Sequence, residues 1–115
     1  MSSNISFVEY VCDQIKDAGN ITFKKMFGEY GVYCNNKIIG LICDDQFFLK
    51  TTEGGRNFII EHSLDGITEA PAYKGAKPSF VIEKLDDREY IVNLIKTTYL
   101  ELPEPKPKKK KIKNN

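Results

Sequence analysis

The first stretch of the chain carries apolar residues at intervals of three and four, a pattern that predicts an amphipathic helix. The apolar positions are Phe7, Val8, Val11, Cys12, Ile15 and Ala18. Ser6 and Glu9 have the spacing of a capping box at the start of this run, and Gly19 supplies a stop at its end. We therefore expect a first helix that buries one face against a sheet.

Beyond this helix the pattern changes to the alternation of apolar and polar residues that is typical of β-strands. Residues 24–50 predict three short strands joined by two tight turns. The turns fall at Asn35-Asn36 and Asp44-Asp45, because Asn and Asp tolerate the positive φ angles of two-residue hairpin turns. Gly28 and Gly31 stand three apart in the first strand, which we expect to break and turn there.

The second half of the chain predicts a short helix, a smaller hairpin and a long final helix. Residues 51–61 begin with turn-forming residues and continue as the short helix. Residues 72–74 and 79–83 would form the two hairpin strands. Pro78 stands just before the second strand, where its missing N–H does least harm.

The final helix carries the second apolar stripe of the chain. Its buried positions would be Tyr90, Ile91, Leu94, Ile95, Thr98 and Leu102. Asp86 or Asp87 would cap its first turn, and Pro103 would end it. The predicted order is α-β-β-β-α-β-β-α. Since both terminal helices must bury a stripe, we expect an α+β fold: a two-layer α/β sandwich in which the helices pack on one face of an antiparallel sheet.

Two motifs in the predicted sheet resemble the signature of the TfoX/Sxy N-terminal domain family. The first runs from Lys25 to Tyr33 (KMFGEYGVY) and the second from Leu41 to Lys50 (LICDDQFFLK). The similarity extends from about Phe7 to Leu102, with weaker matches at Ala72-Tyr73 and in the last helix. The resemblance implies a bacterial single-domain member that regulates natural competence or transcription through protein contacts, and not an established enzyme.

The net charge of +1 conceals two parts of opposite sign. Residues 103–115 hold six Lys and one Glu, which leaves eleven Lys and Arg against fifteen Asp and Glu in residues 1–102. We expect residues 1–102 to form one folded domain and residues 103–115, rich in Pro and Lys, to be a disordered tail. The folded part is mildly acidic and the tail strongly basic.

The basic tail is the reason for an alternative function. Its lysines are Lys106, Lys108, Lys109, Lys110, Lys111 and Lys113. Such a run can neutralise phosphates of DNA or RNA without selecting a sequence. The alternative is therefore a small nucleic-acid-associated protein, while the simplest role of the same lysines is solubility. No lipid signal or apolar anchor accompanies the charge, so we expect no membrane contact.

Other features of the sequence narrow the protein class. No apolar run reaches about 18 residues, which excludes a membrane-spanning helix. The first residues lack a basic region followed by an apolar one, so we expect no signal peptide and a cytoplasmic protein. The three cysteines, Cys12, Cys34 and Cys43, are odd in number and widely spaced, which fits neither a disulfide framework nor a zinc site. We interpret them as small apolar residues; Cys34 and Cys43 fall in adjoining predicted strands, which leaves a reactive or redox role as the alternative.

Candidate catalytic residues are few. His62, the sole histidine, falls at a predicted helix end, where an imidazolium would interact with the helix dipole. The pairs Asp44-Asp45 and Asp86-Asp87 fall at turns and caps, where Asp is favoured for structural reasons. Gly54-Gly55 lacks the spacing of a phosphate loop and indicates a flexible helix start more than an anion site. We expect no enzyme, metal or cofactor.

The surface candidates are charged and tyrosine residues of the two hairpin regions. They are Lys24, Lys25, Glu29, Tyr30, Tyr33 and Tyr73. Tyrosine is favoured at binding hot spots and exposed lysines could meet an acidic partner, although the tyrosines could equally pack the face of the sheet. We expect a protein partner. An open sheet edge would also allow a homodimer, although no particular residue indicates one.

Overall fold

The computed structural model of the chain describes residues 4–26, 29–62 and 66–103. The helices are α1 (Ile5–Ile15), α2 (Glu53–His62) and α3 (Arg88–Glu101), and a short 3-10 turn, η1 (Lys16–Ala18), follows α1. The strands are β1 (Ile21–Met26), β2 (Glu29–Cys34), β3 (Lys37–Cys43), β4 (Gln46–Leu49), β5 (Glu69–Pro71) and β6 (Pro78–Ile82).

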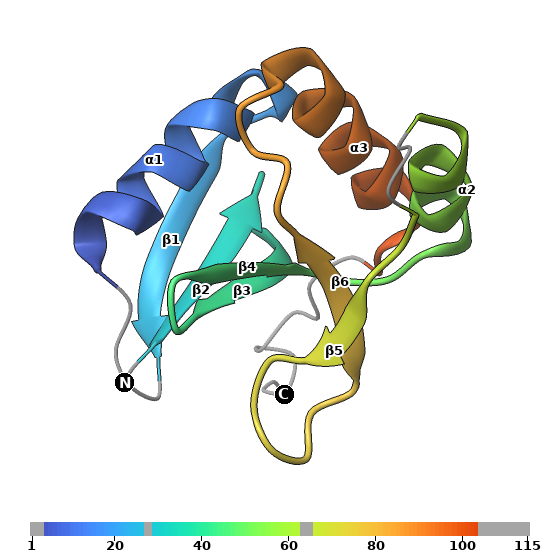
Figure 1. Cartoon of the computed structure of the whole chain (residues 1–115). Helices are drawn as coiled ribbons and strands as arrows, with labels where there is room; N and C mark the ends of the chain where they lie inside the picture. The colour runs from blue at the N-terminus through green and yellow to red at the C-terminus, as the bar shows by residue number, and fades with distance from the viewer. Residues whose placement is uncertain (1–3, 27–28, 63–65, 104–115) are drawn as a thin grey trace, which may run out of the picture.

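The described strands form one sheet in the order β1-β2-β3-β4-β6-β5, and every neighbouring pair is antiparallel. The three helices lie together on one side of this sheet (Figure 1). The predicted fold class is confirmed: the protein is a two-layer α+β sandwich with its helices on one face of an antiparallel sheet.

The first group of strands differs from the sequence prediction in number. Four strands precede α2 instead of three, because the run predicted as one strand divides into β1, which ends at Met26, and β2, which begins at Glu29. The break predicted at Gly28 lies outside the described residues. The predicted break and turn of the first strand is confirmed by the antiparallel pairing of β1 with β2, but Gly31 takes no part in it, since Gly31 lies inside β2 and pairs with both Lys24 and Leu41.

Both predicted tight turns are confirmed by backbone angles. Asn35 and Asn36 join β2 to β3 with φ angles of 51° and 70°. Asp44 and Asp45 join β3 to β4 with φ angles of 53° and 58°. Only residues that tolerate the left-handed region can occupy all four positions, which is why the sequence located these turns correctly.

The start of α1 is not the one that the sequence predicted. Asn4, not Ser6, is the N-cap, and its side chain accepts a hydrogen bond of 2.9 Å from the backbone amide of Ser6. The Asn4 amide itself donates to the carboxylate of Asp45 at 2.7 Å. This hydrogen bond links the start of α1 to the β3–β4 turn. A pattern of neighbouring residues carries no information about such a distant contact.

The smaller hairpin is shifted along the chain relative to the prediction. β5 comprises Glu69–Pro71, so residues 72–74 lie in the connection to β6 and not in a strand. The predicted second strand corresponds to β6, which starts at Pro78. A cap at Asp86 or Asp87 is also confirmed, because Asp87 accepts a hydrogen bond of 3.1 Å from the Tyr90 amide.

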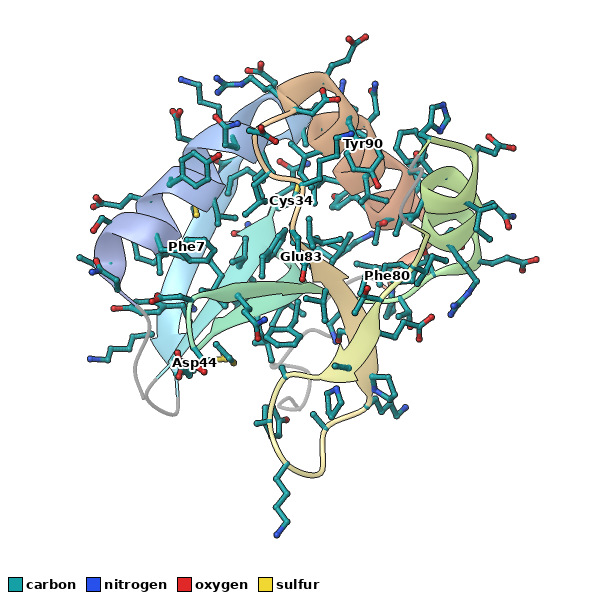
Figure 2. The ribbon with its side chains drawn as sticks, viewed as in Figure 1. Phe7, Cys34, Asp44, Phe80, Glu83 and Tyr90 are labelled. Atoms are coloured by element: carbon teal, nitrogen blue, oxygen red, sulfur yellow. The ribbon has the colours of Figure 1, made fainter. Side chains whose placement is uncertain are left out.

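The hydrophobic core lies between the sheet and the helices, as Figure 2 shows for Cys34 and Phe80. Both predicted helical stripes contribute to it: α1 through Val8, Val11 and Ile15, and α3 through Ile91, Leu94, Ile95 and Thr98. Phe47 and Phe80 supply the largest fully buried groups from the sheet.

Candidate protein-interaction surface

The pairing of the strands defines a face of the sheet that the helices leave uncovered. Gly31 pairs with Leu41, Leu41 with Phe48, and Phe48 with Val81. Paired residues point to the same side, and their neighbours along each strand point the other way, into the core. We call the uncovered side the outer face; its residues include Thr22, Lys24, Tyr33, Ile38, Leu41, Phe48 and Val81.

The outer face is largely apolar. Tyr33, Ile38, Leu41 and Val81 are half-buried, and Phe48 is only 5% exposed. By the same alternation Glu29, paired with Met26, also belongs to this face. Lys24 stands with its ammonium nitrogen 5.7 Å from the centre of the Tyr33 ring, a cation–π geometry. The structure thus brings together two of the residues that the sequence singled out.

The remaining strand candidates divide between the two faces. Lys25 pairs with Tyr30 on the helix side of the sheet, where Tyr30 packs partly against the core. The rings of Tyr30 and Phe23 meet edge to face at 5.8 Å. Glu29 pairs with Met26 and is half-buried. Tyr30 is therefore placed as a packing residue of the inner face, away from Tyr33.

Tyr73 lies apart from the strands, in the β5–β6 connection, with 60% of its surface exposed. It lines a groove of about 510 Å³ that opens beside the outer face. Ile38 and Leu41 of β3 belong to both surfaces, so the groove continues the outer face. Its other lining residues include Lys50, Lys77, Pro78 and Leu102.

The end of α3 forms one wall of this groove. Lys37, which the sequence analysis did not single out, holds this wall in place. Lys37, the first residue of β3, is 3% exposed. Its ammonium group donates to the carbonyl oxygens of Tyr99 at 3.1 Å and Leu102 at 2.9 Å, and lies 4.1 Å from the centre of the Tyr99 ring. A cation here satisfies carbonyls that end a helix and suits the negative end of its dipole.

The cysteines do not form a reactive pair. Cys34 points to the core and its thiol faces the Ala18 carbonyl at 3.8 Å, while Cys43 pairs with Gln46 on the other face. Burial raises the pKa of the thiols of Cys34 and Cys43, and raises the pKa of Cys12 to about 11 with a further contribution from Glu9. All three are protonated near neutral pH, which disfavours nucleophilic chemistry.

The other candidate chemical groups have structural surroundings. His62 ends α2 and stacks on Phe58, with 4.2 Å between the ring centres. Gly54 and Gly55 lie inside the first turn of α2 and not in a loop before it, because α2 begins at Glu53. The part of the chain that the structure describes contains no cluster of three or more His, Cys, Asp or Glu that could hold a metal ion.

Two further observations concern cavities and membranes. The cavity between α2 and β6, lined by Ile59, Phe80 and Tyr90 among others, has a volume of about 60 Å³. That is well below the roughly 300–1,000 Å³ of typical small-molecule sites. Within residues 4–26, 29–62 and 66–103, no helix has the length and apolar character needed to cross a membrane.

Comparison with known proteins agrees with the two motifs, which lie in β1–β2 and in β3–β4. The TfoX N-terminal domain family matches residues 13–102. A Spirochaeta aurantia protein, described as an uncharacterized 12.7 kDa protein in the trpE 5' region, is 32% identical over 114 residues, which cover 98% of this chain and 95% of that protein. The chain belongs to the TfoX N-terminal domain family.

Proposed function

We propose that the protein is a cytoplasmic, non-catalytic regulatory domain that acts through protein contacts in the control of competence or transcription. Membership of the TfoX N-terminal domain family supports a regulatory type of domain. Burial raises the pKa of all three cysteine thiols, which keeps them protonated near neutral pH. These features favour binding over catalysis.

The observation that carries the proposal is the uncovered outer face. A sheet with helices on one side usually exposes polar residues on the other, with apolar residues only toward the core. Here the other side presents Tyr33, Ile38 and Leu41, with Lys24 beside them. Apolar and aromatic surface with a few fixed charges is typical of protein interfaces.

The proposal is tested by replacing exposed groups of this surface in the native host. Lys24→Glu with Tyr73→Ala alters the outer face and the hairpin without touching the core, since both side chains are exposed. The matched control is Lys96→Glu with Tyr10→Ala, which makes the same changes on α3 and α1.

Deleting the gene should lower transformation frequency or competence-gene transcription, and the control variant should restore it. The outer-face variant should fail to do so while folding normally by circular dichroism. If deletion leaves both readouts unchanged, the regulatory role is wrong. If the outer-face variant restores them fully, a different surface makes the contacts.

A second candidate function rests on the separation of charge in the sequence. The six lysines of residues 103–115 stand against an acidic remainder, which favours contact with nucleic-acid phosphates through the tail. If Lys106, Lys108, Lys109, Lys110, Lys111 and Lys113 all engaged duplex DNA, the slope of log affinity against log salt would approach about −5.

The test of this second function compares the wild-type chain with one in which all six tail lysines are glutamine. Duplex DNA and single-stranded RNA binding would be measured at low and physiological salt. Loss of a steep salt dependence on substitution supports the tail as a non-specific nucleic-acid contact. Equal binding by the two chains excludes the tail, and places any affinity for nucleic acid in residues 1–102.

A further inference from the structure

We propose that the groove beside the outer face binds an extended, acidic segment of the partner protein, with apolar side chains of that segment inserted between β3 and the β5–β6 connection. The inference rests on the proposed function, because it names the chemistry of the partner that such a domain would bind. Three properties of the groove carry it: its volume, its sign of charge and its hydrogen-bonding groups.

The groove is large enough to hold side chains of a partner. Its volume of about 510 Å³ falls within the range of roughly 300–1,000 Å³ typical of ligand sites. Ile38 and Leu41 supply apolar surface from β3, Pro78 supplies it from the hairpin, and Leu102 closes the end near α3. Apolar groups of a partner gain by leaving water here.

The charged residues that line the groove are all of one sign. Lys50 and Lys77 belong to the lining, and no Asp or Glu does among the described residues that form it. Both lysines are exposed, so their ammonium groups can move to meet an incoming chain. Carboxylates of a partner would find cations on the rim and apolar surface inside, which is the complementarity that gives an interface its specificity.

The same charge argument favours a separate acidic chain over a basic one as the occupant. Pro103 lines the groove, and the residues that follow it in the sequence carry six lysines and one glutamate. A segment of net charge +5 would face Lys50 and Lys77 with like charges. A separate acidic chain is favoured instead.

The groove also offers partners for a peptide backbone. Thr51 and Ser79 are half-buried lining residues, and a hydroxyl group both donates and accepts hydrogen bonds. An extended segment exposes its amides and carbonyls, whereas a helix satisfies them internally. Tyr73, 60% exposed at the rim, can cover the bound segment with its ring.

The test selects peptides from a random library of twelve-residue sequences displayed on phage, with the full chain as bait. A full-length variant with the six tail lysines changed to glutamine serves as a second bait, since the tail alone could attract acidic peptides. We expect both baits to enrich peptides in which Asp or Glu flank Leu, Ile or Phe.

A selected peptide is then labelled and its affinity measured by fluorescence anisotropy. Lys50→Glu with Lys77→Glu should weaken binding at least tenfold, because attraction becomes repulsion at both rim positions. The matched control, Lys16→Glu with Lys96→Glu, makes the same charge change on the helix layer and should alter affinity less than twofold.

Each other result overturns the groove assignment in a recognisable way. If Lys50→Glu with Lys77→Glu leaves the affinity for an enriched peptide unchanged, the peptide binds elsewhere on the protein. The groove assignment is then wrong, and the proposed protein-binding function stands. Enrichment that disappears with the tail substitutions assigns the attraction to the tail. If no acidic-apolar peptide is enriched, the groove inference fails, and the gene-deletion experiment alone decides the regulatory function.

Discussion

Lys37 is the charged residue most deeply buried among those that the structure describes, and it connects distant parts of the chain. It follows the β2–β3 turn, while its hydrogen-bond partner Leu102 lies 65 residues later. Since Leu102 also lines the groove, the lysine positions the candidate surface as well as the end of α3. A substitution that removes the contacts of Lys37 should therefore also disturb the groove.

Replacing Lys37 by methionine keeps the aliphatic stem and removes the ammonium group. The carbonyls of Tyr99 and Leu102 lose their donor, so we expect the free energy of unfolding to fall by about 2–3 kcal/mol. Urea denaturation measures this. Lys96→Met on the exposed side of α3 is the control, with an expected change within about 0.5 kcal/mol. Equal effects of the two variants would show that the buried contacts contribute nothing.

Because of Cys12, we expect the free energy of unfolding to fall as the pH rises through the alkaline range. Burial, with a smaller contribution from Glu9, raises its pKa to about 11 from an ordinary value of 9.0. A folded-state pKa above the unfolded one means that the stabilising contribution is present below pH 9 and is lost as the pH rises toward 11. Cys12→Ala should therefore lose less stability than the wild type between these pH values. Parallel curves from urea denaturation across this range would contradict the assignment.

At the scale of elements, Gly40 allows the paired strands β3 and β4 to approach each other closely. A methyl group at this position would collide with the carbonyl oxygen of Phe48 and lie 3.2 Å from the Leu49 Cα. Both atoms belong to the backbone of β4, the strand paired with β3, and cannot move aside without disturbing the sheet. The glycine is therefore a requirement of the β3–β4 pairing.

We expect Gly40→Ala to lower the free energy of unfolding by about 3 kcal/mol, or to prevent folding, as overpacking does in dense cores. Gly54→Ala is the matched control. Its new methyl would collide with the end of the Glu101 side chain and lie 3.3 Å from the Thr97 Cγ2. The exposed Glu101 carboxylate can swing away, at the loss of the hydrogen bond that it accepts from the Gly54 amide, while alanine favours the helix. Thermal unfolding followed by circular dichroism measures both variants. If Gly54→Ala proved the more destabilising, the proposed crowding at β4 would be wrong.

The edges of the sheet bear on self-association. β5 has three residues and ends at Pro71, which has no amide to donate, whereas β1 has six residues. Lys24 and Lys25 in β1 are exposed charges of the kind that discourage edge-to-edge pairing. Homodimerisation through β1 stays a prediction, which a mass measured by light scattering would decide.

Local patterns in the sequence predicted the elements that depend on local chemistry. The turns at Asn35 and Asp44 were predicted correctly because few residue types tolerate a positive φ. The cap at Asp87 was predicted because Asp is favoured at the start of a helix. The choice of Asn4 over Ser6 could not be predicted, since it coincides with a contact to Asp45 that is 41 residues away. The bounds of β5 were predicted wrongly for a similar reason, because pairing with β6 decides which residues form this strand.

The candidate surface was predictable only in part. Lys24, Tyr33 and Tyr73 were recognised by residue type, and two of them meet on the outer face. Tyr30 was placed with them only by proximity in sequence, because alternation along β2 sends it to the core side. The groove unites residues from Ile38 to Leu102, and no single stretch of the chain contains its pattern.

At the scale of the whole molecule, the two layers have different roles. The helix layer covers the core and carries isolated exposed apolar residues, such as Tyr10 on α1 and Ile60 on α2. The side of the sheet away from the helices carries the half-buried residues Tyr33, Ile38 and Leu41, and two of these, Ile38 and Leu41, also line the groove that contains Lys50 and Lys77. We propose that this second side binds the partner.

The most direct measurement of that assignment is site-specific photo-crosslinking in living cells of the native host. A photoreactive phenylalanine would replace Tyr73 or Lys77 at the groove, and Tyr10 or Ile60 on the helix layer; all four positions are exposed. We expect both groove positions to give a crosslink to the same protein and neither helix position to give one. Protein crosslinks from Tyr10 or Ile60 alone, or only nucleic-acid adducts from the groove positions, would contradict it.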